Sequence, residues 1–191
     1  MRKLFAYGGI AASAILVAFG IGAIVIGTTG LADVRAEITA QKITATPDAA
    51  ELTNGRLQAG QAITNGAEAR AFADIMEHHT LDSTKGARYA EMGRFLTPAG
   101  TDTSDEAAAA KTPDGRPVEN GLRNMWVTET ALTTALNTAF FAERVAYFSI
   151  VMGVALLLTG IGFLVLTLGG LLGLVSLPSR SRKLHTASVA T

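Results

Sequence analysis

The sequence predicts an all-α membrane protein, in which a hairpin of two transmembrane helices carries a small extracytoplasmic helical bundle on a two-helix stem. Two runs, residues 4–32 and 146–177, contain no charged residue, and each exceeds the roughly 20 apolar residues that cross a bilayer core. All 16 acidic residues lie between Asp33 and Glu143, whereas both ends of the chain are basic. Between the two runs, apolar residues recur at helical spacing.

The basic residues determine the predicted orientation. Arg2 and Lys3 precede the first run, and the tail 178–191 carries three basic residues and no acid. Because basic residues beside a span favour the cytoplasm, we expect both termini, 1–3 and 178–191, to be cytoplasmic in a multi-pass plasma-membrane protein. Residues 31–145 would then be extracytoplasmic. They contain 16 acidic and 11 basic residues, a balance that disfavours nucleic acid as a partner.

The first predicted span covers residues 4–30. The alternative is a cleaved signal peptide, because Gly30, Leu31 and Ala32 form a passable small-x-small cleavage site. The apolar region of a signal peptide is about 7–15 residues long, much shorter than this run, so a span is favoured. In either case the second span, 146–177, would anchor the product.

Small residues recur along both predicted spans. Ser13, Gly20 and Gly27 are spaced by sevens in the first span, and Gly153 and Gly160 form a looser counterpart in the second. We call these five residues the helix-packing seam, because small residues let helix backbones approach closely in a membrane. Either the two stripes face each other inside the hairpin, or part of the first stripe docks another membrane protein or a second copy of this chain.

The segment after the first span is predicted to begin with helix and loop. We expect the first helix to continue outward to Ile43, because its apolar residues stay on one face. Residues 44–66 are rich in turn-forming residues, which predicts a loop with a short helix near 49–52. A helix is expected over 67–79.

The next part of the segment is predicted to contain one more short helix and a flexible loop. Tyr89, Met92 and Phe95 recur at a spacing of three, which predicts a helix over 84–96. Residues 97–120 contain three prolines and two glycines. With so few large apolar residues, this stretch is expected to remain flexible.

One long helix is predicted to combine the outer stem and the second span. It begins near Leu122, and Trp126, Leu132 and Leu136 lie near one face. The two predicted short helices are expected to cover the upper part of this face, around Trp126. Pro178 marks the end of the helix.

The sequence offers little for catalysis or for binding a metal. Asp74 and His78 are four residues apart, so both could reach one ion from one helix face, but a catalytic zinc site needs three protein ligands. His79 is predicted to point toward the apolar face instead. The serines have no neighbouring base, and we expect neither a cofactor nor enzymatic activity.

Several stretches together resemble a family of uncharacterised two-span membrane proteins of actinobacteria. Some members of that family carry an automatic label as aromatic ring-opening dioxygenases, for which the residues here supply no chemistry. The resemblance implies a plasma membrane of an actinobacterium and no site residue. The stretches that carry it are Met1 to Leu4, Met92 to Leu96, Trp126 to Asn137 and Leu156 to Phe163.

Two functions are compatible with these patterns. The first is a non-enzymatic membrane accessory or structural subunit, which acts by helix–helix and extracytoplasmic association with another membrane protein or a second copy. The alternative is an extracytoplasmic sensor, in which a small ligand binds near Tyr89, His79 and Trp126 and the hairpin reports its presence.

Overall fold

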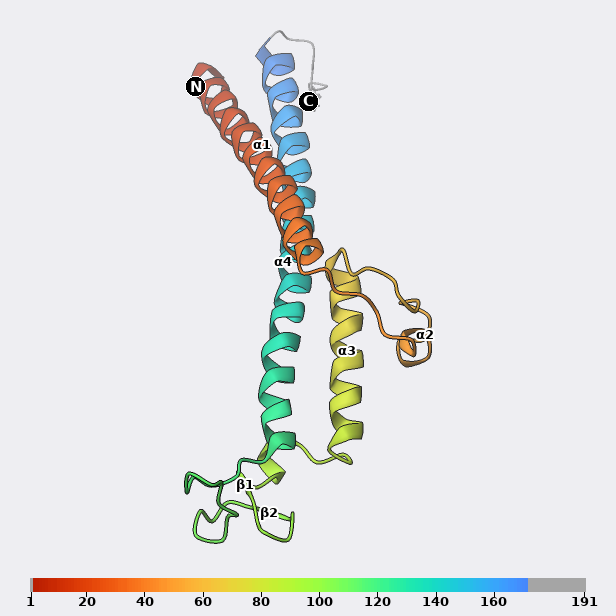
Figure 1. Cartoon of the computed structure of the whole chain (residues 1–191). Helices are drawn as coiled ribbons and strands as arrows, with labels where there is room; N and C mark the ends of the chain where they lie inside the picture. The colour runs from red at the N-terminus through yellow and green to blue at the C-terminus, as the bar shows by residue number, and fades with distance from the viewer. Residues whose placement is uncertain (1, 172–191) are drawn as a thin grey trace, which may run out of the picture. The chain divides into compact units, whose positions relative to one another are not determined.

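The computed structural model describes residues 2–171 and is mostly helical (Figure 1). The predicted basic tail, 178–191, and the last six residues of the predicted second span lie outside this range. The elements in chain order are helix α1 (Arg2–Ala40), helix α2 (Ala49–Leu52), helix α3 (Gly66–Ser83), the 3₁₀ helix η1 (Tyr89–Glu91), strands β1 (Phe95–Leu96) and β2 (Asp102–Thr103), and helix α4 (Gly121–Leu171).

Two described helices, α1 and α4, are long and apolar enough to cross a membrane. Their most apolar windows are only 11% buried, whereas the core helix of a water-soluble domain would be mostly buried. Phe5, Phe19 and Leu166 are among the large side chains exposed along these stretches. Such outward-facing apolar surface is typical of helices solvated by lipid.

The chain divides into two compact units, and α1 and α4 contribute residues to both. The first unit contains residues 1–24 and 151–191, and the second contains residues 25–150. Within the first unit, α1 and α4 form a closely packed helix pair. A Cβ atom at Gly20 would lie only 2.8 Å from the carbonyl oxygen of Gly153, so glycine is what allows this approach.

The 25–150 unit has an apolar core to which α1, α3, α4 and the long loop before α3 all contribute. That loop was predicted over 44–66, and its short helix α2 is confirmed at Ala49–Leu52. The side chains of Leu57 and Ile63 are almost fully buried, and a bridge between Thr44 and Ala62 closes the loop. Leu57 and Ile63, together with Ala45 and Ala49 of the same core, thus anchor a segment rich in turn-forming residues.

Helix α3 begins with a strong cap. The Asn65 side chain accepts a hydrogen bond from the Glu68 backbone N–H at 3.0 Å, and the Glu68 carboxylate accepts one from the Thr64 N–H at 2.7 Å. The first bond satisfies a donor that the helix start leaves free, and the second ties the residue before the cap to the first turn. The helix ends at Ser83, just before Lys85 and Gly86, both of which have positive φ.

The predicted helix over 84–96 is wrong. Lys85 and Gly86 adopt φ of 53° and 83°, a left-handed conformation that stops a helix. The chain then forms only the single turn η1 before strand β1. Gly93 lies directly against the backbone of Thr103, an approach that a side chain would prevent.

The 97–120 segment is irregular, as predicted, but many of its backbone groups are hydrogen-bonded. Strand β1 pairs antiparallel with β2, and Phe95 also bridges Glu119. The backbone N–H of Leu96 donates to Val118 at 2.9 Å. These short pairings correct the all-α class to a mostly helical one, because backbone bonding orders a stretch that has too few apolar side chains to do so.

Helix α4 is continuous from Gly121 to Leu171, within the predicted range. Its Trp126 and Leu136 side chains are buried, at 5% and 8% exposure. Leu132, which was predicted to lie near the same face, is 46% exposed, and Leu122 at the start of the helix is 45% exposed.

Candidate functional site

The structure places the helix-packing seam between α1 and α4 of the same chain. In the first unit, Gly20 lies against Gly153, Gly160 lies against Leu16 and Val17, and Ser13 is buried. In the 25–150 unit, Gly27 lies against Ala146 and Ile150. The seam is therefore used inside the chain, which is the first of the two interpretations, and these residues offer no free surface to another protein.

The structure does not bring Asp74 and His78 together as ligands. Asp74 pairs with Arg56 at 3.0 Å and Arg70 at 3.6 Å. His78 faces Asp82 at 3.3 Å. Within residues 2–171, no group of three or more potential metal-ligating side chains is found.

The sequence predicted that His79 faces the apolar core, but in the structure its ring pairs with a carboxylate instead. Its Nε2 atom lies 2.7 Å from an Asp48 carboxylate oxygen, and both side chains are 42% exposed. The other two residues of the predicted ligand-binding region, Trp126 and Tyr89, make contacts within the chain. The Trp126 indole donates to the Ala87 carbonyl at 2.9 Å, and the Arg123 guanidinium stacks 3.8 Å from the Tyr89 ring centroid.

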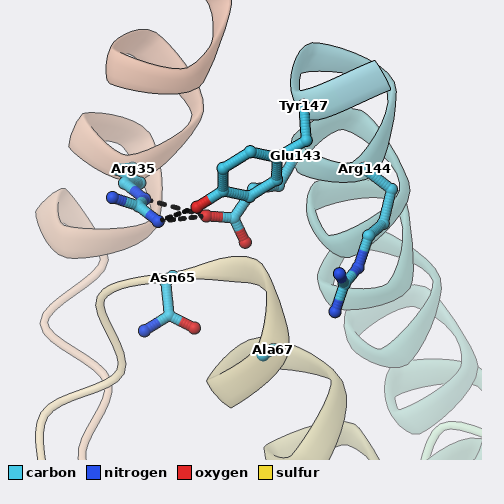
Figure 2. A pocket seen from close by; sticks show the side chains of 6 residues that line it. All are labelled: Arg35, Asn65, Ala67, Glu143, Arg144 and Tyr147. Carbon is cyan, nitrogen blue, oxygen red and sulfur yellow. Dashed lines mark hydrogen bonds and ion pairs between the residues drawn. The ribbon is translucent and has the colours of Figure 1, made fainter. Parts of the chain in front are cut away.

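A buried carboxylate joins three helices of the 25–150 unit. Glu143 of α4 is 4% exposed, and its Oε1 atom accepts a hydrogen bond from Arg35 of α1 at 2.8 Å. Its Oε2 atom accepts one from the backbone N–H of Gly66, the first residue of α3, at 2.7 Å. Arg35 also donates to the Tyr147 hydroxyl at 2.7 Å, as Figure 2 shows. We call Arg35, Gly66, Glu143 and Tyr147 the Glu143 junction.

The charged and polar groups of this junction stabilise the packing of the three helices. Arg35 neutralises the charge of Glu143, and the α3 N-terminus adds a favourable dipole. A Cβ at Gly66 would lie 2.8 Å from Phe140 Cα, so glycine lets α3 approach α4 closely. A small pocket of about 410 Å³ lies beside the junction, with Arg144 on its rim. The junction was not predicted, because its partners are 77 and 108 residues away from Glu143.

The same three helices border an open apolar groove of about 950 Å³. Its walls come from the end of α1, from α3 and from α4, with Ile43 of the following loop. Two acidic side chains, Asp33 and Glu37, also line it. We call this feature the three-helix groove; its main apolar residues are Val34, Ile38, Phe72, Met76, Leu132 and Leu136.

The Glu143 junction fixes the walls of the three-helix groove. Arg35 lies between the groove residues Val34 and Glu37 on α1, and Gly66 starts the helix that supplies Phe72. One carboxylate therefore holds α1 and α3 against α4 beside the groove. No sequence signal pointed to the groove directly, because Leu132 was predicted on the covered face of α4 and its 46% exposure is seen only in the structure.

Hydrogen bonding lowers the pKa of Glu68 at the start of α3, as it does those of Asp48 and Asp114 elsewhere in this unit. Burial raises the pKa of Glu68, but hydrogen bonds from the Thr64 N–H and hydroxyl and from the Gln61 side chain lower it by more. The net effect is a Glu68 pKa below its ordinary value of 4.5. This carboxylate therefore stays ionised at the start of α3, where a negative charge is favoured.

Comparisons of the chain with protein-family models, curated proteins and solved structures gave no match. The resemblance to the actinobacterial membrane family therefore stays a prediction. What the protein does has to be argued from the two units themselves, above all from the three-helix groove and the junction that borders it.

Proposed function

We propose that the protein is a non-enzymatic accessory protein of the plasma membrane, which binds a helix of another membrane protein in its three-helix groove. It would insert as a two-span hairpin with both termini in the cytoplasm and residues 31–145 outside. The observation that carries this proposal is the groove, an open apolar surface of about 950 Å³ whose lining continues into the apolar core of the 25–150 unit.

The groove is not explained by contact with lipid tails. Asp33 and Glu37 line it, and ionised carboxylates are costly in a hydrocarbon environment. Asp33 is the first charged residue after the run 4–32, so the groove begins where the chain would leave the membrane. An apolar surface of this kind in contact with water marks an interaction site.

The dimensions of the groove fit an α-helix. Its lining on α4 runs from Leu132 to Ala142, which is about 15 Å at 1.5 Å per residue. A helix of this length makes about three turns. A helix of three turns placed here would complete a four-helix bundle with α1, α3 and α4.

The occupant can be identified by site-specific photo-crosslinking in membranes of the native host. A photoreactive amino acid at Leu132, inside the groove, should form a discrete adduct with an apolar helical segment of another membrane protein. Val127 is the matched control, because it is 54% exposed on α4 and does not line the groove; it should give no such adduct. Mass spectrometry of the crosslinked peptides reads both results.

Other adducts at Leu132 would contradict the proposal. A crosslink to lipid, to a second copy of the chain, or to no partner at all would exclude a partner helix in the groove. A crosslink to a small apolar molecule would favour the sensor function instead, because the groove volume lies within the 300–1,000 Å³ of ligand pockets.

The orientation is tested separately by labelling cysteine variants on intact cells with an impermeant thiol reagent. The chain has no native cysteine, so the background is clean. Ser104→Cys should be labelled, because residues 31–145 are proposed to lie outside, and Ser188→Cys should be labelled only after lysis. Labelling of both variants on intact cells would contradict the hairpin.

A further inference from the structure

We propose that the helix bound in the three-helix groove carries two basic residues, one helical turn apart, on the flank that faces α1. These residues would pair with Asp33 and Glu37. This inference rests on the proposed function, since it specifies the chemistry of the partner that the groove would receive.

The two carboxylates are placed to recognise a helix. Asp33 and Glu37 are four residues apart on α1, so they lie on one helix face about 6 Å apart along its axis. Both line the groove. Lys or Arg residues three or four positions apart on a partner helix would repeat the same spacing.

Neither carboxylate is neutralised inside the described chain. Asp33 and Glu37 form no ion pair with another residue of the range 2–171. Four other acidic side chains of the 25–150 unit pair with arginine, namely Asp74, Glu77, Asp114 and Glu143. Two unpaired negative charges at the edge of an apolar groove create a field that a basic partner would complement.

The charge is confined to one side of the groove. The α3 wall contributes Phe72 and Met76, and the α4 wall contributes uncharged residues such as Leu132 and Thr138. A bound helix would therefore need its basic residues on one flank and apolar residues on the face turned to α3 and α4. Long Lys or Arg stems could also cover apolar surface on the way to Asp33 and Glu37.

Charge also disfavours two other occupants. The 25–150 unit contains 16 acidic and 11 basic residues, so a second copy would bring an acidic unit against an acidic groove edge. An anionic lipid headgroup would meet the same repulsion from Asp33 and Glu37. A basic amphipathic helix is the chemistry that suits both the apolar walls and the acidic edge.

The test uses the full chain in nanodiscs of a zwitterionic lipid and two fluorescent, helix-stapled peptides of about 15 residues, a length at which helices are marginal without support. The peptides share one apolar face and differ only at two flank positions four apart, which are Lys in one and Glu in the other. Fluorescence anisotropy measures the Kd of each, with empty nanodiscs as the blank.

We expect the Lys peptide to bind the wild type about tenfold more tightly than the Glu peptide, since each exposed ion pair contributes modestly. In the double variant Asp33→Asn/Glu37→Gln, this ratio should fall below about twofold. The matched control is Glu51→Gln/Glu106→Gln, which removes two charges at exposed positions away from the groove and should keep the ratio near tenfold.

The outcomes separate this inference from the proposed function. Equal binding of the two peptides to the wild type, with binding lost in Leu132→Glu, would overturn the acidic recognition and leave the groove as a helix site. Binding of neither peptide, or binding that Leu132→Glu does not weaken, would overturn the groove as a helix site and the recognition with it. An unchanged ratio in Asp33→Asn/Glu37→Gln would also overturn the role of these two carboxylates.

Discussion

The α1–α4 pair of the first unit and the 25–150 unit hold their helices together by different means. In the first unit, small residues such as Gly20 and Gly153 bring two helix backbones into direct contact. In the 25–150 unit, the Glu143 junction holds three helices by hydrogen bonds to a buried carboxylate, and an apolar groove stays open beside it. The seam between α1 and α4 is thus covered within the chain, whereas the three-helix groove stays open to a partner.

The largest expected effect distinguishes a buried residue of the groove, Leu136, from an exposed one, Leu132. Leu136→Asp should lower the free energy of unfolding by about 4 kcal/mol, because it places an unpaired charge at a buried site. Leu132→Asp should cost less than about 1 kcal/mol, since Leu132 is 46% exposed and an exposed substitution costs little. Thermal unfolding in mild detergent measures both. Equal losses would mean that Leu132 is also part of a closed core.

A smaller effect is expected at the Glu143 junction. Glu143→Ala should cost about 3 kcal/mol, because it leaves Arg35 and the Gly66 N–H without their acceptor. Since the Arg35 side chain is 44% exposed, water compensates part of the loss. The cost therefore lies at the low end of the range for a broken buried ion pair. The control Glu51→Ala, at an exposed position, should change the unfolding midpoint little. If the two variants unfold alike, the junction does not hold the three helices together.

The contrast between these regions also explains how far the sequence could predict the structure. Helices α1 and α4 were predictable because their signals are local: long uncharged runs and, for α4, regular apolar spacing. The junction was not, because Glu143 meets Arg35 and Gly66 only after the chain has folded. The apolar spacing of Tyr89, Met92 and Phe95 suggested a helix that the left-handed pair at 85–86 forbids.

The third prediction concerns the close-packed helix pair. Gly20→Leu should destabilise the pairing of α1 with α4 by about 1–3 kcal/mol, because a Cβ there would lie 2.7 Å from the Leu157 backbone nitrogen and overpacking has this cost. Gly22→Leu is the matched control, since a Cβ at Gly22 meets no described atom within 4 Å.

The measurement for both glycine variants is the thermal midpoint in detergent, together with the oligomeric state by native mass spectrometry. If the seam docked another protein, Gly20→Leu would loosen a complex and spare the monomer. The structure reverses that expectation, because the seam lies inside one chain. A monomer of normal stability in the Gly20→Leu variant would restore the docking interpretation of the seam.

The smallest expected effect is a pH dependence at the start of α3. The pKa of Glu68 in the folded chain is below its ordinary value of 4.5, so its ionised form stabilises the fold. That contribution is complete above pH 4.5 and is lost as the pH falls through the lower, folded-state pKa.

Glu68→Gln removes the titration but keeps a side chain that can cap the helix. Near pH 7 the wild type should be more stable than this variant by about 0.5 kcal/mol, a typical value for a helix-capping carboxylate. As the pH falls below 4.5 and through the folded-state pKa of Glu68, the difference should shrink, because Glu68 then becomes neutral like the Gln side chain. Thermal midpoints of the two proteins across this range measure the difference directly, and other titrating groups cancel in the comparison. A difference that stays constant from neutral to acidic pH would show that the charge of Glu68 does not stabilise α3, and that capping by Asn65 is sufficient to hold its first turn beside Glu143.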